Sequence, residues 1–187
     1  MKRVNPGVLS TGIVAVAALR ILMAPYPNIE PIMLFTVVTA LTLGPIAGFF
    51  MGFGSMVLSN IFMSNAILPW ILHMPLVTVY TSLTYGLIGL VAGLLGIVKR
   101  NWRRLDLTAL VAVTTVFYDL VTAICFAIQF YGFVGIPAAL TAQIPFTMLH
   151  LSNALFAFLF APYLLKAFTK TREISVQTVL KRLGVYT

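Results

Sequence analysis

Long apolar segments, separated by short polar or proline-rich stretches, dominate this chain. A helix crosses a bilayer once when about 17–25 consecutive residues are mainly apolar. The pattern predicts six membrane-spanning helices, at residues 8–24, 32–43, 46–63, 70–98, 107–130 and 145–166.

The stretch from Pro25 to Asn60 decides how the rest of the chain is arranged. The polar segment PYPNIEP precedes an apolar run that continues to Phe62 and is too long for one span. Because Pro45 has no amide proton and disfavours helix at the residue before it, we expect the chain to turn back at Gly44-Pro45. The following helix carries glycine at every fourth position, a spacing that favours close helix packing in lipid.

The composition supports the same fold class. Hydrophobic residues make up 60% of the 187 residues and charged residues only 9%, too few to cover a soluble surface. The sequence therefore predicts an all-α polytopic membrane protein. Residues 1–170 would form one six-helix membrane domain, and residues 171–187 a cytoplasmic tail whose apolar positions lie on one side of an amphipathic helix.

The basic residues predict the orientation of the chain. In the six-span arrangement every lysine and arginine except Arg20 falls on one side, including those of the loop KRNWRRLD. Basic loops stay in the cytoplasm, so both termini are expected there, with the protein in the plasma membrane. The net charge of +8 is then explained by topology and contact with anionic lipid, and no nucleic-acid partner is expected.

Small residues recur at every fourth position near the start of the first span: Gly7, Thr11 and Ala15. Such a row permits close approach of another helix. Two interpretations remain open, namely packing inside the bundle and a docking face for another subunit.

Polar residues cluster toward the outer half of the predicted bundle. Arg20 either pairs with Glu30 or extends to the membrane interface. A carboxylate as deep as Asp119 is expensive, so it is either functional or a neutral structural residue. His150 and Asn153, three residues apart, are expected on one face of the sixth span. The candidate substrate-binding residues are Asn28, Glu30, Asn60, His73, Asp119, Gln129, His150 and Asn153.

These groups suit a pocket that opens to the outside, with few polar groups and apolar walls. If that pocket were elsewhere, the place to expect it is between the third and fourth spans, around Asn60 and His73.

Several kinds of chemistry are not expected. The chain has no G-x-x-x-x-G-K-[ST] motif for ATP and no H-E-x-x-H motif. It has one cysteine and two widely separated histidines, so neither a metal site nor a cofactor is predicted. The text Gly52-Phe53-Gly54-Ser55 departs from the G-x-S-x-G order of a serine nucleophile, which disfavours an intramembrane enzyme.

Three segments together carry a family resemblance: PNIEPIM, LGPIAGFFMGFGSMVLSN and IPFTMLHLSNALFAFLFAPYLLKAF. In this order and spacing they resemble the substrate-binding S components of energy-coupling factor (ECF) vitamin transporters, over most of residues 8–168. The resemblance implies a subunit that captures a small water-soluble vitamin from outside. It also implies a transmembrane T component and two cytoplasmic ATPases as partners, with Gly7, Thr11 and Ala15 at the positions that contact the T component.

The substrate and one alternative stay open. The chain begins Met-Lys, whereas the cobalt and nickel members of that family begin Met-His, so a metal-ion substrate is disfavoured. Riboflavin, pantothenate, cobalamin and a nucleobase derivative all fit the expected pocket. The alternative function is a self-sufficient secondary carrier or channel that uses Asp119 as an ion or proton relay.

Overall fold

The computed structural model describes residues 6–25, 30–66, 75–99 and 101–182, with side chains for 6–25, 30–63, 76–99 and 101–170. Throughout these ranges the regular structure is helical, without a strand. The helices are α1 (Pro6–Met23), α2 (Pro31–Leu43), α3 (Pro45–Ala66), α4 (Pro75–Val98), α5 (Arg104–Tyr131), the short 3₁₀ helix η2 (Phe133–Gly135), α6 (Ile136–His150) and α7 (Ser152–Arg182).

The protein is a helical membrane protein. Within the described ranges, five segments are long and apolar enough to cross a bilayer: α1, α3, α4, α5 and the stretch from η2 into α7. The sixth apolar segment, α2, is shorter. Each of these six segments overlaps one predicted apolar run, and the six-span topology itself stays a prediction.

Proline sets the start of four helices. Pro6, Pro31, Pro45 and Pro75 are each the first residue of their helix, where a missing N–H costs nothing and the fixed φ angle already suits a helix. Gly44 ends α2 with a φ of 102°, and its N–H donates to the Ala40 carbonyl at 2.9 Å. Only glycine adopts such a φ without strain, so the predicted reversal at Gly44-Pro45 is confirmed.

Helix α2 lies at the centre of the molecule. It packs against α1, α3, α4, α5 and α7, and nearly all of its side chains are buried. With 13 residues it is about 20 Å long, whereas the hydrocarbon core is about 30 Å thick. One end of this central helix therefore lies below the level of its neighbours, and Glu30, directly before it, lies inside the bundle rather than above it.

The predicted close packing along the glycine row is confirmed between α3 and α4. A Cβ added to Gly48 would lie 2.7 Å from the Gly89 carbonyl oxygen, and one added to Gly52 would lie 2.5 Å from the Tyr85 carbonyl oxygen. Neither backbone can move aside cheaply, so only glycine allows these two helices to approach this closely.

The sixth predicted span is wrong in its boundaries. We expected one helix over 145–166, but α6 ends at His150 and α7 begins at Ser152. The Ala154 N–H bonds the Leu151 carbonyl, a tighter i→i+3 turn that interrupts the regular helical ladder. His150 and Asn153 therefore belong to two helices instead of one face of a single helix.

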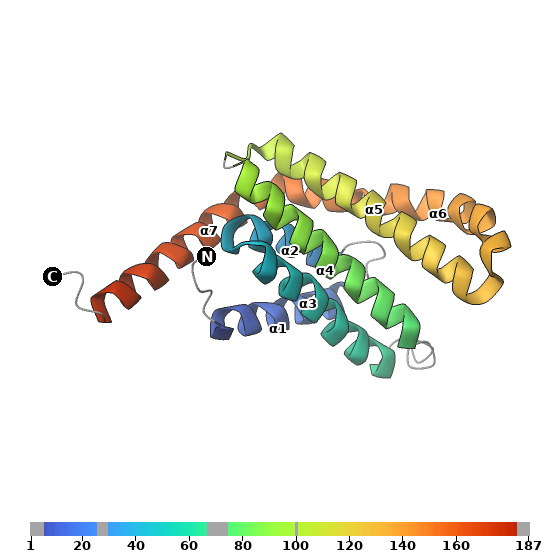
Figure 1. The fold of residues 1–187 in the computed structure, drawn as a ribbon, viewed down its shortest axis with the longest axis horizontal. Coiled ribbons are helices and arrows are strands. Elements are labelled where there is room, and N and C mark those ends of the chain that lie inside the picture. Colours follow the sequence, from blue (N-terminus) through green and yellow to red (C-terminus); the bar gives the residue numbers. More distant parts are fainter. Residues whose placement is uncertain (1–5, 26–29, 67–74, 100, 183–187) are drawn as a thin grey trace.

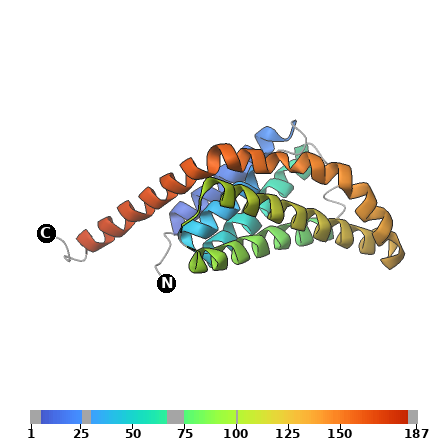
Figure 2. The same cartoon turned by 90° about the horizontal axis from the view of Figure 1, so that it is seen from above.

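Figures 1 and 2 show how the ends of the helices are distributed. The α2–α3 turn and the basic connection between α4 and α5 lie at one end, called here the basic end; η2 lies at the other, the opposite end (Figure 1). At the basic end, Lys99 pairs with Asp106 at 2.8 Å, and the Arg103 N–H also donates to Asp106. Helix α7 extends past this end and runs without a break through residue 170 to Arg182.

Candidate functional site

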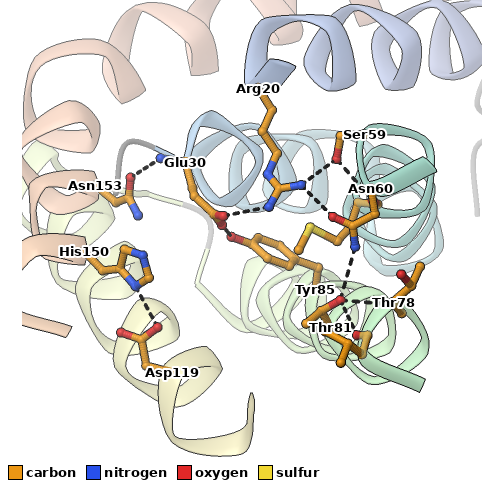
Figure 3. Close-up of polar contacts among 12 residues, drawn as sticks. Arg20, Glu30, Ser59, Asn60, Thr78, Thr81, Tyr85, Asp119, His150 and Asn153 are labelled. Carbon is orange, nitrogen blue, oxygen red and sulfur yellow. Dashed lines mark hydrogen bonds and ion pairs between the residues drawn. The ribbon is translucent and has the colours of Figure 1, made fainter. Parts of the chain in front are cut away.

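A group of polar side chains meets inside the bundle (Figure 3). Two of them, Arg20 near the end of α1 and Glu30 directly before α2, lie away from the basic end. We call Arg20, Glu30, Ser59, Asn60, Tyr85 and Asn153 the polar layer. Arg20, near the end of α1, donates from Nη1 to Ser59 Oγ at 2.9 Å and to Asn60 Oδ1 at 2.8 Å. Its Nη2 pairs with Glu30 Oε1 at 3.0 Å. The prediction that Arg20 pairs with Glu30 is confirmed, and the alternative that it extends to the interface is wrong.

Glu30 joins the largest number of elements. Its carboxylate accepts hydrogen bonds from Arg20 of α1 and from the Tyr85 hydroxyl of α4, and its backbone N–H donates to Asn153 Oδ1 of α7 at 2.9 Å. Burial alone would raise the pKa of this carboxyl, but the charge of Arg20 and the Tyr85 hydrogen bond lower the pKa below its ordinary value. Glu30 therefore stays ionised and fixes the start of α2 against three neighbouring helices.

A second buried pair lies beside the polar layer. Asp119 of α5 accepts from His150 at the end of α6, with Oδ1 and Nδ1 2.8 Å apart. The Asp119 side chain is only 1% exposed, and its Oδ2 has no hydrogen-bond partner among the described residues. Figure 3 shows His150 between Asp119 and Asn153, so this Asp119–His150 pair continues the row of polar groups into α5.

The predicted site residues have three different outcomes. Glu30, Asn60, Asp119, His150 and Asn153 are brought together around the polar layer. Gln129 is apart from them, and its side-chain oxygen is buried without a partner in the described part of the chain. The remaining two candidates, Asn28 and His73, lie outside the described residues.

Sequence reasoning missed three members of this arrangement. Ser59 and Tyr85 bond directly to the ionic centre, and Thr81 accepts from the Asn60 amide at 3.4 Å. A usable signal was present: Thr78, Thr81 and Tyr85 repeat at three and four residues, which places a polar stripe on one face of an otherwise apolar helix.

A cavity of about 620 Å³ lies beside these groups, between α4, α5, η2 and α6. None of its lining residues was among the predicted site residues, because the sequence does not show that η2 and α6 fold back along α5. The cavity also differs from the expected fallback location between the third and fourth spans.

The small-residue row of α1 does not pack inside the bundle. Gly7, Thr11 and Ala15 are all exposed, whereas α1 contacts the bundle through its other face, where Val16 and Ala17 are buried. The first of the two interpretations is therefore wrong, and the docking interpretation stays a prediction.

The polar layer and the Asp119–His150 pair are suited to binding a ligand and to holding the helices together. Arg20 faces Glu30, and His150 faces Asp119, so the ionisable groups of this region are paired with one another. Across the described residues, no three histidine, cysteine, aspartate or glutamate side chains come together in a group that could hold a metal ion.

No family model, no curated protein and no solved structure matches this chain. The assignment of a function therefore depends on the sequence motifs and on the geometry described above.

Proposed function

We propose that this chain is the substrate-binding S component of an ECF-type transporter. It would capture a small water-soluble vitamin or a related micronutrient outside the cell. A T component and two ATPase subunits would then drive its release into the cytoplasm.

The observation that supports this proposal most is the meeting of the three sequence segments that carry the family resemblance. Glu30 belongs to the first segment, Ser59 and Asn60 end the second, and Asn153 belongs to the third. Arg20 joins the first two segments, and the Glu30 N–H bonds Asn153 of the third. Segments separated by up to 123 positions thus form one buried polar layer. This spatial proximity supports treating the three segments as parts of one motif.

The orientation follows from the positive-inside rule. The basic end, with Lys99, Arg103 and Arg104, would face the cytoplasm of a plasma-membrane protein, with the N-terminus on the same side. The polar layer and the cavity would then lie in the outer half, where a substrate arrives. The exposed row of Gly7, Thr11 and Ala15 offers α1 as the surface on which the T component docks.

The test is association with an ATP-hydrolysing module. We expect the tagged chain, purified from membranes of its source organism in mild detergent, to retain a T component and two ATPases and to show ATP hydrolysis. Thr11→Leu should abolish this association, because it adds bulk where two backbones approach closely. Ser10→Leu is the matched control, since Ser10 is also exposed but points about 100° away around the helix. Association that survives Thr11→Leu would contradict the docking face, and absence of any ATPase from the wild-type preparation would contradict the function.

One observation favours the alternative of a self-sufficient carrier. A buried carboxylate paired with an imidazole, as in the Asp119–His150 pair, is the kind of group found in membrane proton relays. A carrier would concentrate its substrate in proteoliposomes that contain this chain alone and a proton gradient. An S component would not, and would need the ATPase module.

A further inference from the structure

The cavity between α4, α5, η2 and α6 is built mainly from aromatic and small side chains. Tyr80, Phe126, Tyr131 and Phe146 supply aromatic surface on three sides. On α6, Ala138, Ala139 and Ala142 form a smooth wall that lets a flat group approach the helix closely. Its volume, about 620 Å³, is in the range of about 300–1,000 Å³ that is usual for small-molecule sites.

Few polar groups line this cavity, and their hydrogen-bonding capacity is partly fixed. The Thr81 hydroxyl donates to the Val77 carbonyl at 2.7 Å, and the Thr122 hydroxyl donates to the Tyr118 carbonyl at 2.9 Å. With their protons used in this way, both oxygens are acceptors toward the cavity. Gln143 adds a side-chain amide that can both donate and accept.

No charged side chain is among the residues that line the cavity in the described part of the chain. The charged groups of the neighbouring polar region face one another and are absent from the cavity lining: Arg20 pairs with Glu30, and His150 pairs with Asp119. An ionic ligand would therefore lose part of its hydration without gaining a counter-charge, which is unfavourable in an apolar site.

We propose that this cavity is the substrate site and that its ligand is an uncharged molecule with a flat, largely apolar body and a polar edge that donates hydrogen bonds to Thr81 and Thr122. This inference rests on the proposed function and narrows its substrate class. Anionic and cationic vitamins are disfavoured, and uncharged conjugated ring systems are favoured, because they stack on the aromatic walls.

Through Thr81, hydrogen bonds would connect the polar edge of the ligand to the polar layer. Thr81 accepts from the Asn60 amide, and Asn60 in turn accepts from Arg20. A ligand bound to Thr81 is thus two side chains away from the ion pair that holds α1 against the start of α2. An acyl chain of a lipid, the competing occupant of an apolar cavity, would form no hydrogen bond with Thr81, Thr122 or Gln143.

The first test measures charge selectivity in the purified full-length chain, without knowledge of the ligand. In a Cys125→Ala background, Ala139→Cys places a thiol on the cavity wall, and Thr141→Cys places one on the exposed side of the same helix. Both thiols are treated with three methanethiosulfonate probes: an uncharged benzyl reagent, a trimethylammonium cation and a sulfonate anion. The benzyl-to-ion rate ratio is then compared between the two positions.

We expect this ratio to be at least about tenfold higher at position 139 than at position 141, equivalent to about 1.4 kcal/mol of discrimination against charge. Equal ratios at the two positions would overturn the proposal. A thiol at position 139 that reacts with none of the probes would also overturn it, because the cavity would then be closed or filled by a lipid chain.

The second test identifies the occupant by mass spectrometry of the chain purified from its source membranes. We expect the wild type and the control variant Thr141→Trp to retain a molecule that is uncharged at pH 7. Ala142→Trp, whose indole would fill the cavity, should lose this molecule. A charged ligand, an acyl lipid, or equal retention by Ala142→Trp would refute the assignment. The proposed function is tested separately, since association with the ATPases does not depend on which molecule fills the cavity.

Discussion

Replacing Arg20 by methionine should destabilise the protein more than any uncharged change in the polar layer. The side chains of Arg20 and Glu30 are only 13% and 16% exposed, so the carboxylate left behind would be largely buried without its cation. Removing one partner of a buried ion pair costs about 3–5 kcal/mol. Because Glu30 keeps the Tyr85 hydrogen bond and some contact with solvent, we expect a loss near 3 kcal/mol, at the lower end of that range.

The loss expected for Arg20→Met can be distinguished from the loss of a single neutral hydrogen bond. Interhelical hydrogen bonds in membrane proteins contribute about 0.6 kcal/mol on average, so Ser59→Ala, which removes one acceptor of Arg20, should cost about that much. The double variant Arg20→Met/Glu30→Gln should be more stable than the sum of its single changes predicts, by about 1.5–3 kcal/mol. Such a coupling energy measures the ion pair itself and removes the effects of altered packing.

The assay is reversible unfolding in mixed micelles with increasing dodecyl sulfate, followed by the loss of helical circular dichroism. All four members of the cycle and Ser59→Ala are measured under the same conditions. If Arg20→Met cost no more than Ser59→Ala, or if the two single changes were additive, the ion pair would not stabilise this fold. The structural role assigned to Glu30 would then be wrong.

Three further predictions use the same unfolding assay. Folding lowers the pKa of Glu30 from its ordinary value of 4.5, so the stability gained from its ionisation is complete above pH 4.5 and should decline as the pH falls through the lower folded pKa. Glu30→Gln should remove this decline. An unchanged pH profile of stability in that variant would contradict the prediction. Gly89→Ala should cost about 1–3 kcal/mol of stability, because the added Cβ would meet the Gly48 carbonyl. Gly54→Ala should cost less than half as much, because its Cβ would meet only the Ile13 side chain, at 3.2 Å. Equal effects of the two changes would mean that α3 and α4 can separate. Asp119→Asn should cost about 1–3 kcal/mol through the lost charge-assisted bond to α6, and a neutral result would show that α6 is held by other contacts.

Much of the fold follows directly from local sequence signals. Length and hydropathy predicted the apolar helices, and Gly44-Pro45 predicted the turn because few other dipeptides combine a positive φ with a missing N–H. The glycine row predicted close packing because spacing of four residues places small side chains on one face. The break at Leu151 carries no such signal, since neither glycine nor proline occupies that position, and it was missed.

Local sequence signals also predicted part of the candidate site. Buried polar residues within apolar helices are expensive and hence conspicuous, which is why Glu30, Asn60 and Asp119 could be selected from the sequence. Their partners could not be selected in the same way. Tyr85 resembles any aromatic residue of a membrane helix until its hydroxyl is placed beside Glu30, and the cavity exists only because α6 returns along α5.

The two halves of the molecule are stabilised by different interactions, and the cavity lies between them. Helices α1 to α4 are joined by glycine-mediated backbone contacts and by the polar layer, so none of them can shift without breaking an ion pair or a close packing contact. Helix α6 has no buried residue, and among the described helices it packs against α5, η2 and α7. A structure varies in stability along its length, and elements with little buried surface open most readily.

We therefore expect the wall of the cavity formed by α6 to move more readily than the wall formed by α4. The Asp119–His150 pair, a buried polar contact between α5 and the end of α6, would oppose such a movement.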